Sequence, residues 1–225
     1  AASDVYKRQT ETNVAVASDH VSLIDTVDYI HLKTGKYRLT ATLMDKETGA
    51  VILDKDGKAV TGTKVFENTS RTGKVDVEIN LDATSLIGKE VVVFEVMTNE
   101  ANGTVVATHQ DINDAGQTIK FPEIKTKASD ANTGSNLVEA STNMKIKDTV
   151  SYKNLIVGKT YTINGKLMDK ETGKPALDDE GKEITSSVKF TAESKNGTVD
   201  VIFEFSGVKL AGKPIVAFES LTSVS

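Results

Sequence analysis

The sequence predicts an all-β chain folded into two tandem β-sandwiches of the immunoglobulin-like type. Apolar and polar residues alternate over short segments such as 74–79 and 198–205, as expected for strands with one buried face. Turn-forming pairs such as Asn102-Gly103 and Asn196-Gly197 separate these segments. No segment keeps helical spacing, and nearly the same sequence occurs twice. Many short strands separated by turns are typical of a sandwich.

The strands are expected in the same order in both copies. In copy one the strand-like segments include 37–43, 74–79 and 89–96, and in copy two they include 161–167 and 198–205. The run over 89–96 is rich in β-branched residues, which is typical of a central strand. Segments 82–86 and 207–210 are each long enough for a single helical turn.

The duplication predicts two domains. The matching segments are 25–29 with 148–152, 43–49 with 167–173, and 92–95 with 216–219. They recur at a nearly constant distance of about 124 residues, which indicates tandem copies of one unit. The copies meet at Phe121-Pro122-Glu123. We therefore expect one domain over 10–122 and another over 123–225, with a very short linker.

The first nine residues differ from the rest of the repeat. Ala1–Gln9 do not resemble their counterparts in copy two, Ile124–Asn132, whereas the copies run in parallel from about Thr10 onward. We expect residues 1–9 to be a sequence-assembly remnant in place of the first strand. A divergent first strand is the alternative.

Composition narrows the possible functions. The 225 residues carry a formal net charge of −5, with a pI of about 5.3 and interspersed charges. We therefore expect neither nucleic acid nor membrane as a partner. There is no run long enough to span a bilayer and no signal peptide, so any export signal is expected outside this sequence. The absence of cysteine excludes disulfides and thioester chemistry. No cofactor is expected.

Four motifs occur in a fixed order along the chain. They are Asp-Thr-Val-x-Tyr, Leu-Met-Asp-Lys-Glu-Thr-Gly, Val-(Val/Ala)-Phe-Glu and, in copy one only, the strand-like His-x-Asp-x-x-Asp-x-x-Gln-Thr of His109–Thr118. Together they resemble the Thr–Gln ester-bond domains, also called VaFE repeats, of Gram-positive surface adhesins and pilus-like proteins. The resemblance covers the chain from Thr10 onward. It implies a prealbumin- or CnaB-like form of the sandwich.

The resemblance also implies a self-crosslinking reaction. A threonine on the first strand would attack the side-chain amide of a glutamine on the last strand, giving an ester and ammonia. The glutamine would be Gln117, assisted by His109, and the threonine would be Thr126 of copy two, with Thr149 as second choice. The assisting carboxyl groups would be Asp25 and Glu95 in copy one, and Asp148 and Glu219 in copy two.

These residue types suit that chemistry. A threonine hydroxyl is a poor nucleophile at neutral pH, and a neutral histidine can take its proton. Two adjacent carboxyl groups do not both ionise readily, so one keeps a proton and can stabilise the amide oxyanion. Because the reaction happens once per domain, it is self-modification and not the turnover of an enzyme. A calcium loop over Asp111, Asn113 and Asp114 is a weaker alternative, since no bidentate glutamate follows.

Each copy lacks one half of the bond. Copy two ends before any segment that matches His109–Thr118, and copy one has Ser3 at the position of Thr126. We therefore expect neither domain of this chain to carry an intact ester. We also expect the second domain to be the less stable one, because losing a strand exposes apolar surface and backbone groups.

The leading functional hypothesis is a stalk segment of an extracellular adhesin anchored in a Gram-positive cell wall. Its ester bonds would give mechanical and proteolytic stability. Its partners would be neighbouring repeats of the same polypeptide, with any host-surface ligand bound by other domains. The alternatives are a pilin-type sandwich with a Lys–Asn isopeptide bond, using Lys125 or Lys127 and Asn113, and a module that binds a ligand through its loops.

Overall fold

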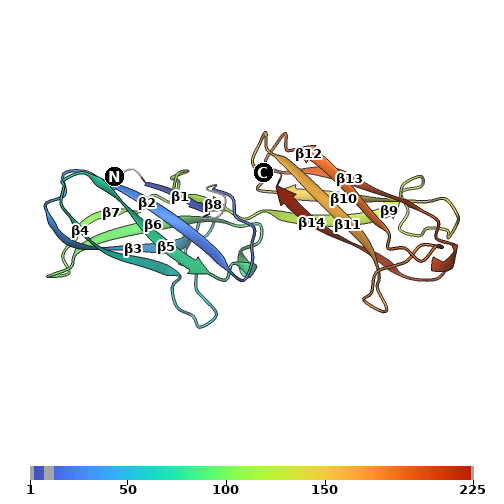
Figure 1. The fold of residues 1–225 in the computed structure, drawn as a ribbon, viewed down its shortest axis with the longest axis horizontal. Helices are drawn as coiled ribbons and strands as arrows, with labels where there is room; N and C mark the ends of the chain where they lie inside the picture. The colour runs from blue at the N-terminus through green and yellow to red at the C-terminus, as the bar shows by residue number, and fades with distance from the viewer. Residues whose placement is uncertain (1–2, 8–12, 224–225) are drawn as a thin grey trace. The chain divides into compact units, whose positions relative to one another are not determined.

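The chain forms two compact units, Ala1–Pro122 (unit 1) and Glu123–Ser225 (unit 2). The structure, a computed structural model, describes the backbone of residues 3–7 and the whole of residues 13–223. Each unit is a sandwich of antiparallel sheets (Figure 1), which confirms the predicted fold class. Within the described residues, no helix is long and apolar enough to cross a membrane.

Unit 1 places β7 and β8 on the same edge of β6. One sheet has the order β1-β2-β5, and the other has the order β4-β3-β6-β7 with β8 also paired to β6. Residues Glu95–Thr98 of β6 pair with β7, and Glu90–Val92 pair with β8. The elements are β1 (Ser3–Lys7), β2 (Val21–Tyr29), β3 (Gly35–Asp45), β4 (Thr61–Asn68), β5 (Gly73–Leu81), η1 (Thr84–Leu86), β6 (Glu90–Asn99), β7 (Val105–His109) and β8 (Thr118–Lys120).

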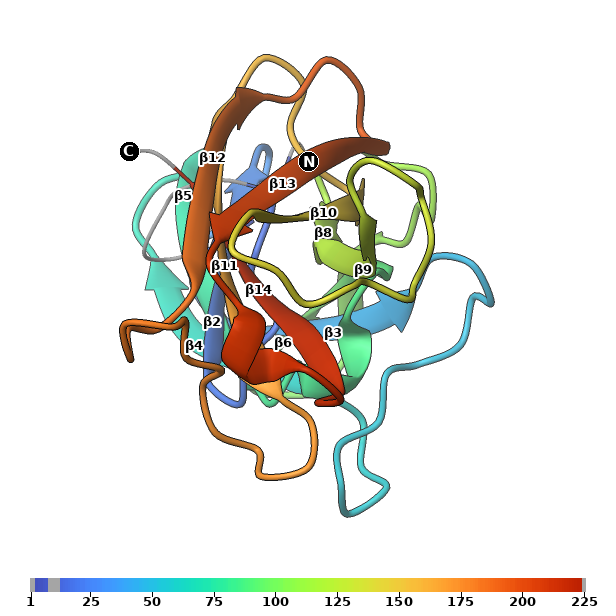
Figure 2. The same cartoon turned by 90° about the vertical axis from the view of Figure 1, so that its right-hand side faces the viewer.

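Unit 2 repeats this plan up to the strand that matches β6. Its sheets have the orders β13-β10-β9 and β12-β11-β14 (Figure 2). The elements are β9 (Glu123–Asp130), β10 (Met144–Lys153), β11 (Thr160–Asp169), β12 (Thr185–Thr191), β13 (Gly197–Phe205), η2 (Val208–Leu210) and β14 (Ile215–Ser223). No described residue of unit 2 pairs with the outer edge of β14, where β7 and β8 would lie.

The most closely repeated motif, Leu-Met-Asp-Lys-Glu-Thr-Gly, is a strand end followed by a tight turn. Asp45 Oδ1 accepts the backbone N–H groups of Glu47 and Thr48 at 2.9 and 3.2 Å. Asp169 makes the same two bonds in unit 2, at 2.9 and 3.3 Å. Gly49 closes the first turn with a φ of 71°, a conformation that favours glycine. Turn chemistry therefore accounts for the identity of the two copies here.

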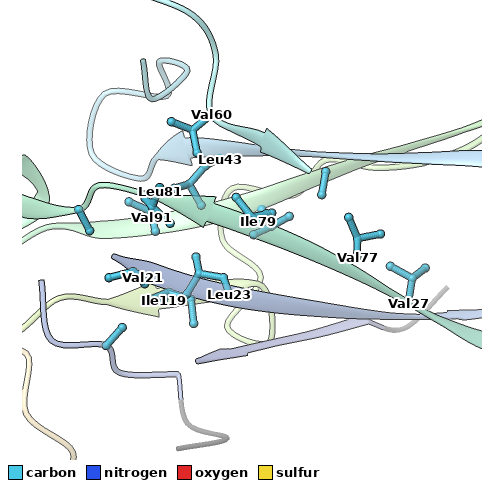
Figure 3. Close-up of a cluster of buried hydrophobic side chains, with 14 of the residues drawn as sticks. Val21, Leu23, Val27, Leu43, Val60, Val77, Ile79, Leu81, Val91 and Ile119 are labelled. Atoms are coloured by element: carbon cyan, nitrogen blue, oxygen red, sulfur yellow. The ribbon is translucent and has the colours of Figure 1, made fainter. Parts of the chain in front are cut away.

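The core of each unit comes from the inward faces of its strands. In unit 1, Val75, Val77 and Ile79 of β5 are buried at alternate positions. Figure 3 shows Ile119 of β8 within the same cluster. In unit 2, Phe203 is fully buried and supplies much of the aromatic bulk. With no tryptophan and few aromatic residues, both cores are built mainly from aliphatic side chains.

Residues 3–7 occupy the place of a first strand. β1 pairs with β2 so that Ser3 stands opposite Val27, and β9 pairs with β10 so that Thr126 stands opposite Val150. Ser3 therefore has the register position of Thr126. The side chains of residues 1–9 lie outside the described residues, and their foreign origin stays a prediction.

The expectation of a single strand over His109–Thr118 is wrong. β7 ends at His109, and β8 begins at Thr118. Between them the chain turns, because Asp111 Oδ1 accepts the N–H of Asn113 at 2.9 Å and Asp114 Oδ1 accepts that of Gly116 at 2.8 Å. The loop returns the chain to β6, so that both ends of the motif face the same strand.

Unit 2 is expected to unfold before unit 1. The buried apolar cluster of unit 1 holds 20 residues, whereas the two clusters of unit 2 hold 14, so unit 2 gains less free energy from burial. Limited proteolysis followed by mass spectrometry should give first cuts after residue 123 and a persistent fragment that contains unit 1. First cuts within residues 13–121 would contradict this.

Candidate functional site

A cluster of buried polar side chains lies inside unit 1. Asp25 of β2 and Glu95 of β6 point inward from opposite sheets, with exposed fractions of 0% and 2%. Gln117, which precedes β8, is 1% exposed, and its backbone oxygen accepts the N–H of Val93 at 3.0 Å. Glu95 and Gln117 are both polar neighbours of the Asp25 carboxyl group. Residues far apart in sequence thus meet between the sheets.

Burial controls the charge of this cluster. Loss of solvent, followed by the close approach of the Glu95 carboxyl group and repulsion from its charge, raises the pKa of Asp25 to about 9. The Gln117 amide and the His109 ring act in the opposite direction, but more weakly. At neutral pH Asp25 therefore carries a proton. A protonated carboxyl group between an acidic neighbour and an amide can donate a hydrogen bond to a developing oxyanion.

His109 bridges two carboxyl groups. Its Nδ1 lies 3.1 Å from Glu95 Oε2, and its Nε2 lies 3.0 Å from Asp114 Oδ2. His109 stands directly opposite Glu95 in the β6–β7 pairing, which fixes the ring at the edge of the cluster. Asp114 therefore orients the ring, a role that sequence analysis did not assign. The sequence spacing does not reveal this contact, because only the folded loop between β7 and β8 brings Asp114 back beside His109.

The cluster is poorly satisfied by ordinary hydrogen bonds. Both carboxyl oxygens of Asp25 and both polar atoms of the Gln117 side chain are buried without a well-formed bond among the described residues. Buried polar groups of this kind cost free energy, and native proteins keep few of them outside functional sites. The arrangement suits a reactive site better than a structural one.

Unit 2 contains a similar buried carboxyl pair, next to a threonine hydroxyl group. Asp148 of β10 is fully buried, and Glu219 of β14 approaches it from the opposite sheet. Burial, followed by the close approach of the Asp148 carboxyl group and repulsion from its charge, raises the pKa of Glu219 to about 8. The Thr126 hydroxyl group is a polar neighbour of the Glu219 carboxyl group and partly offsets this rise in pKa. A hydroxyl group and two carboxyl groups are thus brought together.

The two candidate threonines face opposite sides of their sheet. Thr126 stands opposite the buried Val150, on the side of the sheet that faces the core, and is itself exposed. Thr149 alternates with the buried Asp148 and Val150, and its hydroxyl donates to Asp200 Oδ1 at 2.8 Å on the outer face. This geometry favours Thr126 as the nucleophile in unit 2.

The residues of the alternative Lys–Asn isopeptide bond are not brought together beside a buried acid. Lys125 and Lys127 flank Thr126 on the outer face of β9 and are exposed, as is Asn113 in its loop. A lysine–asparagine bond needs a buried acid beside both partners. Over residues 13–223, no group of histidine and acidic side chains is placed to hold a metal ion.

Comparison with known families agrees with this geometry. The family model described as "T-Q ester bond containing domain" matches residues 2–121 and again residues 122–225. The chain belongs to this family. The two matches of the T-Q ester bond domain divide the chain within one residue of the boundary between the two units.

Solved structures and curated proteins add little to this assignment. A Mobiluncus mulieris adhesin "containing intramolecular disulfide, isopeptide, and ester bond cross-links" is 9% identical, with 98% of each chain covered and a TM-score of 0.47. The C-terminal domain of a Streptococcus agalactiae AgI/II polypeptide is 8% identical, with 99% and 96% coverage and a TM-score of 0.45. The corresponding domain of a Streptococcus pyogenes antigen I/II-family protein is 7% identical, with 98% and 95% coverage and a TM-score of 0.44. No curated protein matches the chain.

Proposed function

We propose that this chain is a structural segment of an extracellular bacterial adhesin, anchored in a Gram-positive cell wall and built from domains that cross-link themselves through Thr–Gln esters. The observation that carries the proposal is the burial of Gln117 against the Asp25–Glu95 pair. Family membership supports the chemistry. The cross-linked domain would serve as a stalk segment that carries mechanical load. Each domain would react only once, to form its own ester.

The proposed reaction balances as an acyl transfer. The hydroxyl oxygen of the first strand attacks the side-chain carbonyl carbon of Gln117 while His109 accepts the hydroxyl proton. Protonated Asp25 donates a hydrogen bond to the amide oxygen as negative charge develops there. The C–N bond then breaks, His109 returns its proton to nitrogen, and ammonia leaves. Folding holds the strands together, which supplies the effective concentration.

The cross-link would resist both force and proteases. It joins the first strand to the segment before β8, so the strands that close the sandwich cannot separate while the ester is intact. A covalent link of this kind stabilises a domain chiefly by restricting its unfolded chain. This role needs no cofactor and no contact with nucleic acid or membrane.

The Ser3→Thr variant tests the proposal in unit 1. β1 has the register of β9, so this variant puts a threonine at the position of Thr126. We expect its intact mass to be lower by one ammonia than its sequence requires, while the unsubstituted chain keeps its full mass. Adding Gln117→Ala should restore the full mass.

A chimaera controls for the possibility that the sequence around Ser3, and not the chemistry of the site, prevents the first strand from reacting. Residues 1–9 are replaced by the sequence of residues 124–132, which supplies β9 from Ile124 onward in the same register. If neither this chain nor the Ser3→Thr variant loses ammonia, although both fold, the proposed cross-linking chemistry is wrong.

A further inference from the structure

Three Asn-Gly pairs occur in the chain, at Asn102-Gly103, Asn164-Gly165 and Asn196-Gly197. An asparagine followed by glycine can lose its side-chain amide spontaneously, because the next backbone nitrogen can attack the side-chain carbonyl carbon. Glycine has no side chain to obstruct that attack, and its backbone turns freely. The reacting residues are the same at all three pairs, so only the fold can make their reactivity differ.

The pair Asn164-Gly165 is held in the middle of a sheet. Gly165 of β11 stands opposite Ser186 of β12 and Glu219 of β14, so the backbone is paired on both sides. A Cβ atom at Gly165 would lie 2.6 Å from the Phe203 ring, so the strand is also packed tightly against the core. Ring closure requires the backbone to leave the extended conformation, and here that would break the sheet. We therefore expect this pair to be inert.

The pair Asn196-Gly197 is tied to other segments of unit 2. The Asn196 Oδ1 atom accepts the backbone N–H of Asn154 at 3.2 Å, so the side chain is fixed to a neighbouring loop. Gly197 begins β13 opposite Tyr152, and a Cβ atom there would lie 2.5 Å from the Tyr152 hydroxyl oxygen. Movement of this pair therefore requires several contacts of unit 2 to open together.

The pair Asn102-Gly103 lies at the tip of the β6–β7 hairpin, outside both strands. Both residues are exposed, and a Cβ atom at Gly103 would meet nothing within 4 Å apart from its chain neighbours. The Gly103 N–H donates to the Asn99 oxygen at 2.8 Å, a single bond at a hairpin tip that opens at little cost. This pair is therefore the least restrained of the three.

The Asn102 side chain is also oriented for the reaction. Its Oδ1 atom accepts the backbone N–H of Thr104 at 3.0 Å. A hydrogen bond to the residue two positions ahead folds the side chain over the intervening nitrogen, which is the attacking atom. The same N–H group stabilises the negative charge that develops on Oδ1 during the attack.

We propose that Asn102 is a site of spontaneous modification, where the chain forms a succinimide with Gly103 and then aspartate or isoaspartate. The Gly103 nitrogen bonds to Asn102 Cγ, the Cγ–Nδ2 bond breaks, and the Gly103 amide proton leaves with that nitrogen as ammonia. Water then adds to either carbonyl group of the ring and opens it. The product adds a negative charge to the hairpin that joins β6 to β7, and isoaspartate also adds a carbon atom to its backbone.

The test is peptide mapping of the full chain after incubation at pH 8, with aspartate and isoaspartate quantified at each pair. We expect Asn102 to react about tenfold or more faster than Asn164 or Asn196, because local opening costs less at a hairpin tip than within a paired sheet. In guanidinium chloride the three rates should converge, since the fold no longer distinguishes the pairs. Equal rates in the folded chain, a first reaction at another pair, or an Asn102 that reacts only after unfolding overturns the proposal.

Two matched variants test the attacking atom. Gly103→Ala should slow the reaction at Asn102 about tenfold or more, because a methyl group obstructs the approach of the nitrogen. Gly57→Ala is the control, since Gly57 also has a positive φ, of 75°, in an exposed turn of unit 1. Equal rates at Asn102 in the two variants would contradict attack by the Gly103 nitrogen.

This modification is independent of the proposed ester, although each step releases one ammonia. A Gln117→Ala chain cannot form the ester and should still be modified at Asn102. An Asn102→Ala chain should show no succinimide, while its Gln117 side chain is unchanged. If the Gln117→Ala chain keeps Asn102 intact under the conditions in which the parent chain is modified there, the proposal is wrong.

Discussion

Replacing Asp25 with asparagine is expected to stabilise unit 1 at neutral and mildly alkaline pH. The buried carboxyl group has a pKa of about 9 in the folded chain, against an ordinary value of 3.8. The folded state therefore binds more protons than the unfolded state between these values, and the free energy of unfolding falls as pH rises through this window. Asparagine keeps the shape, cannot ionise, and can donate to Glu95. The gain should be largest near pH 9.

Calorimetry from pH 5 to pH 9 gives the measurement. The transition of unit 1 should fall in temperature as pH rises, and the Asp25→Asn variant should flatten that dependence. The transition temperature of unit 2 should also fall as pH rises, because the pKa of Glu219 is raised as well, to about 8. Asp56→Asn, in an exposed turn, is the control and should change nothing. A variant that is less stable than the parent at pH 8 would refute this account of Asp25.

The fold was predictable because its signals are local. Alternation defines strands such as β5 and β13, and the Asp-Lys-Glu-Thr-Gly turn has the same hydrogen bonds in both units. Register could not be predicted as readily, because a one-residue shift reverses which face a residue occupies. That is why Thr126 and Thr149 stayed open until the pairing of β9 with β10 separated them.

The site was predictable only in part. Gln117, His109, Asp25 and Glu95 came from a resemblance that includes several motifs, and the structure brings these four side chains together. Asp114 could not be assigned, because its contact with His109 depends on a loop that sequence analysis took for a strand.

Truncating Phe121 to alanine is expected to be the most damaging single change in unit 1. The ring is fully buried and directly follows β8, the strand that Gln117 precedes. Loss of a buried phenylalanine costs about 3–5 kcal/mol, part of it from the cavity that remains. In a domain of this size that corresponds to a fall in Tm of at least about 10 °C. Unit 2 should melt as before, because the change lies outside it.

Phe218→Ala is the matched control, since the same truncation is made at a ring that is 60% exposed. Surface changes are usually worth less than about 0.5 kcal/mol, so the transition of unit 2 should scarcely move. In the Ser3→Thr background, Phe121→Ala should also slow the loss of ammonia, because β8 no longer holds Gln117 in place. Equal effects of the two truncations would mean that Phe121 does not anchor β8.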